Sequence, residues 1–331
     1  MGRSIVGWKG KLLSRAGREI LIKAVAQATL TYTMSCFKLP DSLCMDLNAM
    51  VRNFWWGQKE SKRKMAWISW DKLCQRKSDG GMGFKNLKAF NLALLAKQGW
   101  RIVQNPSSLI HKVLKVKYFE NTSFLEAQLG KRSSYTWRSL LEARCILERG
   151  MRWCIGNGRN VDIWRDRWLP TSKSFSVINP RIQRIEGERV VGLLDLDNGT
   201  WDCKKVRNTF LPHEAEVVLR IPISLSLPDN SRIWAWTISR EFIVKSAYRV
   251  ALNMLKEKKG TKACENYSYA SKMTNLWKFI WKLGCPSKIK HFLWRTCKDI
   301  LPTNHCLARR KVTVKDRCVA CGGKESSVHA L

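Results

Sequence analysis

Acidic residues are scarce in this sequence relative to basic ones. The 331 residues contain 26 Asp and Glu against 60 Lys and Arg, which leaves a formal net charge of +34. Such an imbalance opposes compaction by self-repulsion and favours polyanionic partners. We therefore expect a nucleic acid as the partner, ahead of an anionic membrane surface.

Long hydrophobic runs are also missing. No apolar stretch approaches the roughly 20 residues that a membrane span requires, and no hydrophobic signal-peptide segment follows Met1. The twelve cysteines are scattered, and only Cys318 and Cys321 have tight pair spacing, which argues against a disulfide framework. We expect an intracellular protein of the nucleus or cytoplasm, neither secreted nor bound to a membrane.

The usual catalytic motifs are absent as well. Two-metal phosphoryl chemistry requires closely placed carboxylates, but the sequence has no Asp-Asp pair. Asp162 with Asp166 is one of the nearest approximations, and we interpret these residues as caps, turns or salt-bridge partners. His213-Glu214 begins like a zinc-protease helix, but Val217 stands where the second histidine belongs. We interpret His111 as a surface or packing residue and predict no catalytic residue in this chain.

Hydrophobic periodicity predicts a mostly α protein with small β-hairpins, in the α+β class. Ser14 is a predicted N-cap, and Trp164 and Trp168 are expected to pack rather than to stack on bases. Helices are expected from Ser14 toward Phe37, from Asp41 to Trp55-Trp56-Gly57, and over 86–104, 108–118 and 136–149. We predict a helical region at 1–170 with a hairpin near 151–164, a linker with small connecting elements at 171–228, and a C-terminal helical domain at 229–331.

The C-terminal stretch combines tryptophan with basic residues. Trp277, Ile280 and Trp281 share one helical face, and a second helix is expected from Pro286 to Lys298. Its predicted apolar stripe consists of Ile289, Phe292, Leu293 and Thr296. The residues predicted to bind nucleic acid are Lys288, His291, Trp294, Arg295 and Lys298 on the opposite face, and Arg309, Arg310 and Lys311 beyond it.

These residues suit sequence-nonspecific binding of RNA or DNA. Lys and Arg that neutralise phosphates release counterions, so binding is strong and salt-sensitive. Trp294 could stack on a base, a contact worth about 1–3 kcal/mol. The alternative is that Trp294 is packed and the lysines only solvate their face of the helix.

The last residues contain part of a zinc site. Cys318-x2-Cys321 is followed by His329, and Gly322-Gly323 permits the tight turn that such a pair requires. A structural zinc site takes four ligands, and these three residues are the metal ligands that we predict. His305 or Cys306 could supply a fourth by folding back.

Many ordered landmarks of this chain resemble those of one known family. They include Leu13-Ser14-Arg15-Ala16-Gly17-Arg18, Phe54-Trp55-Trp56-Gly57, Gly80-Gly81-Met82-Gly83-Phe84, Trp164-Arg165-Asp166-Arg167-Trp168, Pro286-Ser287-Lys288-Ile289-Lys290-His291-Phe292-Leu293-Trp294-Arg295, and Cys318-x2-Cys321 with His329. The C-terminal part resembles the reverse-transcriptase zinc-binding domain of plant LINE-type (non-LTR) retrotransposons. The preceding part resembles the region that joins this domain to the polymerase.

The resemblance implies a nucleic-acid-binding accessory region that lacks the polymerase catalytic residues. It also implies zinc as cofactor and a reverse transcriptase polymerase domain as a further partner. In the family the zinc motif ends with a cysteine a few residues past the histidine. This chain lacks that cysteine, so it resembles a fragment or truncated copy with an incomplete zinc-binding domain.

Two alternatives compete with the nucleic-acid interpretation. One is a host-recruited protein-interaction or structural module in which the tryptophans belong entirely to the core. The other is a non-functional retroelement remnant. Steeply salt-dependent binding to generic RNA or DNA distinguishes the first interpretation from these two.

Overall fold

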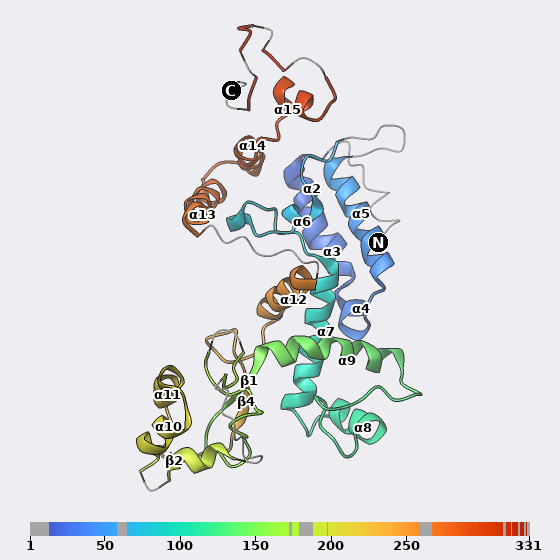
Figure 1. Ribbon diagram of the computed structural model, residues 1–331. Coiled ribbons are helices and arrows are strands. Elements are labelled where there is room, and N and C mark those ends of the chain that lie inside the picture. The colour runs from blue at the N-terminus through green and yellow to red at the C-terminus, as the bar shows by residue number, and fades with distance from the viewer. Residues whose placement is uncertain are drawn as a thin grey trace. The chain divides into compact units, whose positions relative to one another are not determined.

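The structure is a computed structural model that describes residues 13–57, 65–171, 174–178, 188–196, 198–258, 267–313, 316–318, 320–323, 325–327 and 329. Over these residues the chain is mostly α-helical, with short antiparallel strand pairs (Figure 1). This confirms the predicted fold class. None of the helices in this part of the chain combines the length and apolar character needed to cross a membrane.

The chain divides into two compact units. Unit 1 comprises Met1–Met34, Leu39–Asn91 and Lys256–Leu331, and unit 2 comprises Ser35–Lys38 and Leu92–Leu255. These boundaries differ from the predicted divisions at 170 and 228, because the first unit joins segments from both ends of the sequence. The predicted linker, 171–228, lies entirely within unit 2.

Helices from the two ends of the sequence build unit 1. Its elements are α2 (Arg15–Leu21), the π-helical segment η1 (Ile22–Ala26), α3 (Gln27–Thr29), α4 (Thr31–Cys36), α5 (Asp41–Trp56), α6 (Trp70–Leu73), η2 (Lys77–Asp79), the first turns of α7 (Leu87–Gln104), α13 (Tyr267–Lys282), α14 (Ser287–Cys297) and α15 (Asn304–Arg309). The last residues of α4 and most of α7 belong to unit 2.

The sequence determines the ends of these helices as predicted at several places. The Ser14 hydroxyl accepts a hydrogen bond from the backbone N–H of Gly17 at 3.2 Å and so caps α2. Gly57 ends α5 in the left-handed conformation, with φ of 69°. Within α5, Leu47, Val51 and Trp55 recur at intervals of four and are buried.

The core of unit 1 is rich in tryptophan and contains residues from distant parts of the sequence. Trp277 and Ile280 are buried as their shared face predicted. The fully assembled cluster contains Ile22, Ala26, Val51, Trp55, Trp56, Leu73, Cys74, Met82, Phe84, Trp277, Ile280, Trp294 and Ile300. The C-terminal helices therefore complete a core that the N-terminal helices begin.

Unit 2 combines helices with two small strand pairs. Its elements are most of α7, α8 (Leu109–Tyr118), α9 (Tyr135–Gly150), β1 (Met151–Cys154), η3 (Val190–Leu193), β2 (Leu194–Asp195), β3 (Thr200–Trp201), α10 (Cys203–Thr209), α11 (Pro212–Leu219), β4 (Ser231–Trp234) and most of α12 (Val244–Lys258). The predicted helices at 86–104, 108–118 and 136–149 correspond to α7, α8 and α9.

The predicted hairpin near 151–164 is wrong in its pairing. Strand β1 pairs with β4, antiparallel, with Met151 opposite Trp234. The Gly156-Asn157-Gly158 turn does not fold β1 back on the following residues, because it binds the 228–230 segment instead. The Asn230 side-chain oxygen accepts from the backbone N–H groups of Gly156 and Gly158, at 2.9 and 3.1 Å.

The predicted linker contributes to the core of unit 2. Strands β2 and β3 form a hairpin with Leu194 opposite Trp201, and Trp201 packs with Trp168 and Phe210. Trp168 is fully buried and donates from Nε1 to the Ile163 carbonyl at 3.0 Å. Packing of Trp168 is thus confirmed. Several residues of the predicted linker, such as Trp201 and Phe210, form part of the hydrophobic core of unit 2.

Candidate metal centre and surrounding basic residues

The three predicted metal ligands converge. The Sγ atoms of Cys318 and Cys321 and a ring nitrogen of His329 lie within 4.8 Å of one another. Cys321 Sγ and His329 Nε2 are 3.2 Å apart, close to the ~3.5 Å edge of a tetrahedron with ordinary Zn–S and Zn–N bond lengths. In the part of the chain that the structure describes, this is the one group of three or more His, Cys, Asp or Glu side chains spaced to hold a metal ion.

The backbone around the cysteine pair makes a tight turn. The Gly322 N–H donates to the Cys318 carbonyl at 3.0 Å, and the Cys318 N–H donates to the Gly323 carbonyl at 2.7 Å. Gly322 has a φ of 69°, which a glycine adopts without strain. The turn therefore holds both sulfur atoms on the side where His329 lies.

Hydrogen bonds favour the thiolate form of Cys318. Hydrogen bonds from the His329 side chain and from the backbone N–H groups of Cys321 and Ala320 lower the pKa of Cys318 to about 7. The thiolate is the form that binds zinc. The donor set, its spacing and this lowered pKa all fit a zinc ion, which Cys318, Cys321 and His329 would hold.

The donor loop is anchored to α15 and the turn before it. The Asn304 N–H donates to the Glu325 carboxylate at 2.9 Å, and the Ser327 hydroxyl donates to the Asp299 carboxylate at 2.6 Å. The bond from Ser327 is the main cause of a lowered pKa at Asp299. The position of the donor group thus depends on the same helix that carries Arg309 at its end.

Neither alternative fourth ligand joins the group. Cys306 is buried, and its thiol contacts the Asp299 carbonyl and carboxylate at 3.5 and 3.4 Å. His305, its neighbour on α15, is also outside the donor group. Among the described residues the group therefore supplies three of the four positions of a structural zinc site.

The predicted faces of α14 are wrong at two of the proposed nucleic-acid contacts. Trp294 is 1% exposed and donates from Nε1 to the Gly80 carbonyl at 3.0 Å, so its ring cannot stack on a base in this structure. His291 is 3% exposed, and its Nε2 lies 2.9 Å from the Glu19 carboxylate. In contrast, Ile289 and Phe292 of the predicted apolar stripe are 46% and 41% exposed.

A buried carboxylate on α2 explains this reversal. Glu19 contacts His291 of α14, Lys23 at 2.6 Å and Lys77 at 2.8 Å. Burial opposes its ionisation, but hydrogen bonds from the His291, Lys23 and Lys77 side chains outweigh burial and lower the pKa of Glu19 to about 2. The polar face of α14 therefore turns inward, because an acidic partner is already buried there.

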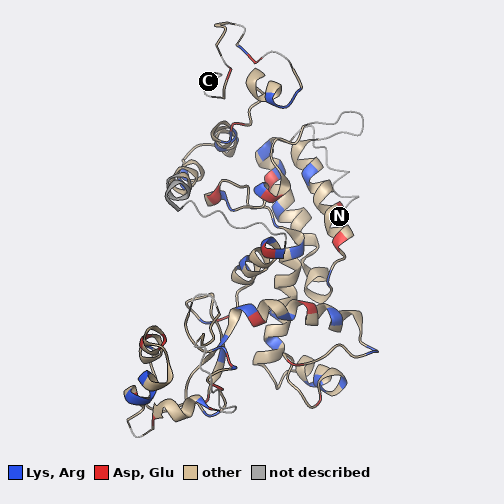
Figure 2. Cartoon of the chain, viewed as in Figure 1, with Lys and Arg blue, Asp and Glu red and all other residues tan. Residues whose placement is uncertain are grey.

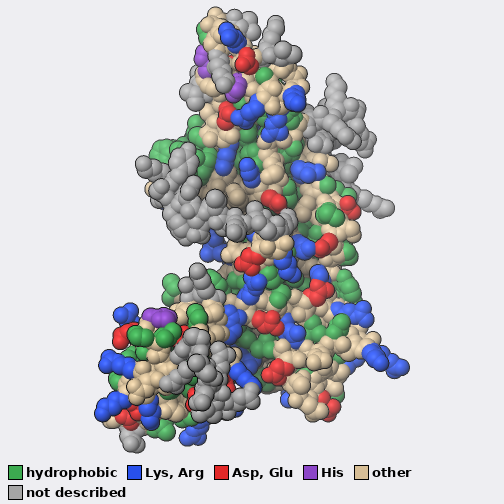
Figure 3. Space-filling view, in the orientation of Figure 1, with side chains coloured by type: hydrophobic (Ala, Val, Ile, Leu, Met, Phe, Trp, Pro, Cys, Tyr) green, Lys and Arg blue, Asp and Glu red, His purple; other side chains and the backbone are tan. Residues whose placement is uncertain are grey.

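The remaining predicted basic residues are distributed between surface and core. Arg295 and Lys298 are partly buried, and the Lys298 ammonium lies 4.6 Å from the Trp277 ring centre. The predicted contacts with exposed side chains are Lys288, Arg309, Arg310 and Lys311. Figure 3 shows Lys and Arg side chains gathered over α14 and α15, with few acidic ones among them.

Two of the exposed arginines have partners within unit 1. Arg309 pairs with the Asp299 carboxylate at 3.4 Å. Arg310 donates to the backbone carbonyls of Ala66 and Trp67, at 3.3 and 2.7 Å. These contacts fix where the two guanidinium groups lie. Asp299 links Arg309 to the donor loop, because its carboxylate also accepts from the Ser327 hydroxyl.

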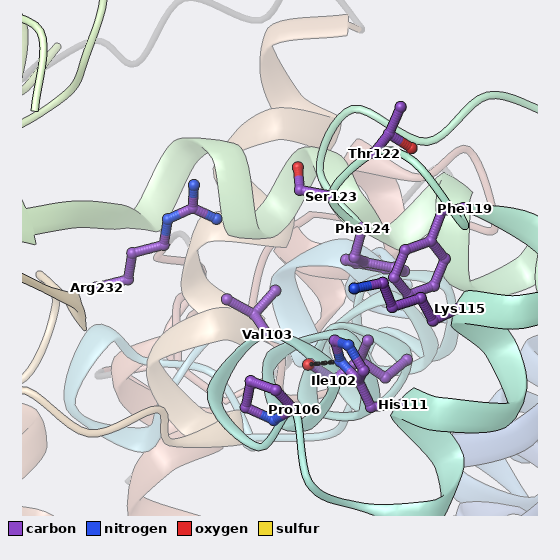
Figure 4. Close-up of a pocket in the computed structure, with 10 residues that line it drawn as sticks. All are labelled: Ile102, Val103, Pro106, His111, Lys115, Phe119, Thr122, Ser123, Phe124 and Arg232. Carbon is purple, nitrogen blue, oxygen red and sulfur yellow. Dashed lines mark hydrogen bonds between the residues drawn. The ribbon is translucent and has the colours of Figure 1, made fainter. Parts of the chain in front are cut away.

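A separate concavity lies in unit 2. A pocket of about 270 Å³ is lined by apolar side chains such as Ile102 and Phe124 together with polar ones, namely His111, Lys115, Thr122, Ser123 and Arg232 (Figure 4). His111 contacts the Ile102 carbonyl through Nδ1 at 2.7 Å and packs edge-on against Phe119. His111 is thus a packing residue, as its sequence context predicted.

Sequence reasoning did not identify Glu19 as the residue that meets His291 of α14. Glu19 belongs to the first predicted helix, about 270 positions before His291 in the sequence. The available signal was the scarcity of acid itself, since a carboxylate among so many cations is expected to have a fixed partner.

The family comparison agrees with this geometry. Residues 242–331 match the family described as zinc-binding in reverse transcriptase. The matched segment contains α13, α14, α15 and the complete donor group. The chain therefore contains a reverse-transcriptase zinc-binding region, and it belongs to the same family as a plant protein described next.

Two relatives from Arabidopsis thaliana extend the similarity. An uncharacterized mitochondrial protein is 45% identical over 149 residues, which cover 45% of this chain and 97% of that protein. A protein named provisionally as a ribonuclease H protein is 30% identical over 338 aligned positions, covering 98% of this chain and 51% of the relative. The chain thus spans about half the length of the second protein.

Proposed function

We propose that this chain is the nucleic-acid-binding accessory region of a LINE-type reverse transcriptase and has no catalytic site of its own. One observation supports the proposal most strongly. The loop with the three zinc-type donors is hydrogen-bonded to α15 and the turn before it, and the exposed basic run Arg309-Arg310-Lys311 lies at the end of the same helix. The RNA or DNA strand is held through its phosphates, without sequence preference.

The phosphate contacts are made by exposed cations. Lys288 and the basic run after α15 are the predicted residues whose side chains reach solvent. Their neutralisation of phosphates releases counterions, which supplies the affinity. His291 and Trp294 instead stabilise the unit that presents these cations.

Zinc has a structural role in this proposal. A bound ion joins the three donors and stabilises the fold of a loop that would otherwise be held by a few hydrogen bonds. Lys and Arg side chains, not the ion, bind the nucleic acid. The three donors hold the loop together, and the loop is hydrogen-bonded to α15.

The name of the longer relative refers to ribonuclease H, but it describes a protein of about twice the matched length. We assign no such activity to this chain. In the described residues, carboxylates do not form a group of three spaced for metal ions, and two-metal hydrolysis requires such a group.

A polymerase domain is the second partner that we propose. Phe279 of α13 is 63% exposed, and Ile289 and Phe292 of α14 are also exposed. Apolar side chains on neighbouring helices favour a protein partner over a solvated surface. This is also the observation that favours the competing interpretation, a protein-interaction module.

A salt titration with labelled RNA and DNA of unrelated sequences tests nucleic-acid binding. We expect a variant with Arg309, Arg310 and Lys311 changed to Gln to reduce the slope of log K against log salt by roughly 2 to 3, since three phosphate contacts are lost. The matched control changes Lys112, Lys115 and Lys117 of α8, three exposed lysines in unit 2, to Gln. Equal losses in both variants would show that total charge, not this site, controls binding.

Metal analysis tests the zinc assignment. We expect about one equivalent of zinc in the purified protein, and its loss in Cys318→Ser and Cys321→Ser. Cys203→Ser, which replaces an exposed cysteine of α10, is the control and should retain the metal. Chelation should increase protease cleavage near 316–329, and an unchanged cleavage pattern would argue against a structural ion.

A further inference from the structure

The pocket of about 270 Å³ lies where the end of α7 meets the segment that follows α8. Ile102 and Val103 of α7 contribute aliphatic surface to it, and Phe119 and Phe124 contribute their phenyl rings. Arg232 of β4 also lines the pocket (Figure 4). All of these residues belong to unit 2, so the pocket is a feature of that unit alone.

The apolar part of the lining is held in place by packing. The rings of Phe119 and Phe124 meet edge-on with their centres 6.3 Å apart, and Phe119 stacks on Trp137 at 5.7 Å. His111 joins α8 to α7 through its contact with the Ile102 carbonyl. A lining fixed in this way is formed before any ligand arrives, which lowers the entropic cost of binding.

Two cationic side chains line the same pocket without a carboxylate partner. The Lys115 ammonium forms neither an ion pair nor a hydrogen bond with another described residue, and Arg232 forms no ion pair among them. The Arg232 guanidinium lies 4.7 Å from the Trp153 ring centre. Figure 2 shows the lysines of α8, a helix that contains no Asp or Glu. An anion from solution therefore meets no competing carboxylate on this helix.

The carboxylates that influence Arg232 are bound elsewhere. Burial lowers the pKa of Arg232, and the charges of Asp166 and Glu126 act in the opposite direction. The Asp166 carboxylate accepts from the Asp162 N–H at 2.8 Å, and the Glu126 carboxylate accepts from the Ser123 N–H at 3.3 Å. These two acids moderate the positive charge of Arg232 but leave its guanidinium without an ion-pair partner among the described residues.

An organic anion satisfies both parts of this pocket. Its apolar body replaces water against the aliphatic and phenyl surfaces, and its acidic group meets the cations where solvent is partly excluded and attraction is stronger. A neutral apolar ligand would satisfy the first part only, and an inorganic anion the second part only. Ligand pockets commonly have volumes of roughly 300–1,000 Å³, so a pocket of about 270 Å³ suits a small ligand.

We propose that this pocket binds a small organic anion, namely a carboxylate or phosphate monoester attached to one ring or a short aliphatic group. The acidic group binds the Arg232 guanidinium, whose paired N–H donors match two oxyanion oxygens. Lys115 adds a second positive charge, and the apolar body lies against Ile102, Val103 and Phe124. The site goes beyond the proposed function, because it contains neither the zinc-type donors nor the basic run after α15.

A titration of the full chain with benzoate and with phenyl phosphate tests the proposal, and benzyl alcohol is the neutral control. We expect both anions to shift the methyl NMR signals of Ile102 and Val103 saturably, and benzyl alcohol to bind roughly tenfold more weakly because it makes no charge-assisted hydrogen bond. The methyl signals of Val51, in the core of unit 1, should not shift. The anion with the higher affinity identifies the acidic group that the pocket prefers.

Three variants locate the charge that binds the anion. Lys115→Gln changes an exposed side chain, so it should retain the fold and weaken benzoate binding several-fold. Arg232→Lys keeps the charge but loses the paired donors, and should weaken binding by roughly tenfold. Lys112→Gln removes a charge from an exposed position of α8 outside the pocket lining, and should bind as wild type.

Three outcomes would overturn the proposal. In the first, benzyl alcohol binds as tightly as benzoate, which would make the pocket a purely apolar site. In the second, Lys115→Gln and Arg232→Lys both retain the affinity of wild type. In the third, neither anion shifts the Ile102 and Val103 signals at millimolar concentration. Each of these outcomes leaves the proposed function standing, since nucleic-acid binding is measured separately.

Discussion

At the scale of single residues, Glu19 determines which side of α14 is buried. From the sequence, the apolar residues of this helix were expected to pack inward and its polar residues to face solvent. The structure places His291 against Glu19 and Trp294 against the Gly80 carbonyl, which is 214 positions away in the sequence. Helical periodicity could not predict this, because the deciding partners are a carboxylate and a carbonyl on distant segments.

Acid should weaken the fold through Glu19. Its pKa is lowered from an ordinary 4.5 to about 2, so the native state binds its proton less readily than the unfolded state. The resulting stability, at most about 3 kcal/mol, is complete above pH ~4.5 and is lost as the pH falls toward 2. Urea unfolding at several pH values should show a difference between wild type and Glu19→Gln that shrinks through this window, and a constant difference would contradict the assignment.

Trp294→Phe separates packing from base stacking. The change leaves the Gly80 carbonyl without its donor and removes part of a buried ring. We expect the free energy of unfolding to fall by roughly 1–3 kcal/mol, with nucleic-acid affinity unchanged. A loss of affinity in a variant that retains its folded circular dichroism spectrum would favour stacking instead.

At the scale of elements, the helices were more predictable than the strands. Caps such as Ser14 and Ser108 act within three residues, so local sequence suffices to place a helix start. The partner of β1 depends instead on Asn230, more than 70 residues further along the chain. Alternating apolar residues on both sides of a glycine turn predict a hairpin. They do not show that a residue from a distant segment, here Asn230, hydrogen-bonds to the backbone of the turn.

Asn230→Ala tests this control of strand pairing. The side chain accepts two backbone hydrogen bonds in the Gly156-Asn157-Gly158 turn. We expect unit 2 to lose about 2 kcal/mol of stability, with faster amide exchange in β1 and β4. Asn105→Ala, at an exposed position after α7, should have no measurable effect, and equal effects would show that the turn is held by other contacts.

At the scale of the whole molecule, the unit that carries the donor group is larger than the family segment. Residues 242–331 supply Trp277, Ile280 and Trp294 to a core that also needs Trp55 and Phe84. The donor residues themselves could be read from their spacing. The sequence did not show that the region carrying these donors packs on the N-terminal helices. A local sequence pattern shows that a helix has an apolar face, but it does not identify the distant residues that pack on that face.

A fragment of residues 242–331 is therefore expected to be poorly folded even with zinc. Addition of a second fragment, 13–91, should restore chemical-shift dispersion and a cooperative unfolding transition. Residues 92–255, which contain the separate core of unit 2, serve as the control and should fold alone. A well-dispersed spectrum from 242–331 by itself would show that this region is autonomous.

The discontinuity of unit 1 also has a consequence during synthesis on the ribosome. Trp55 and Phe84 emerge long before Trp277 and Trp294, and translation at 5–20 residues per second separates them by roughly 10–40 s. During that delay unit 2 can complete its own core, while the indole and phenyl rings of the earlier helices remain uncovered. Nascent chains paused in this interval are natural clients for chaperones that shield apolar surface.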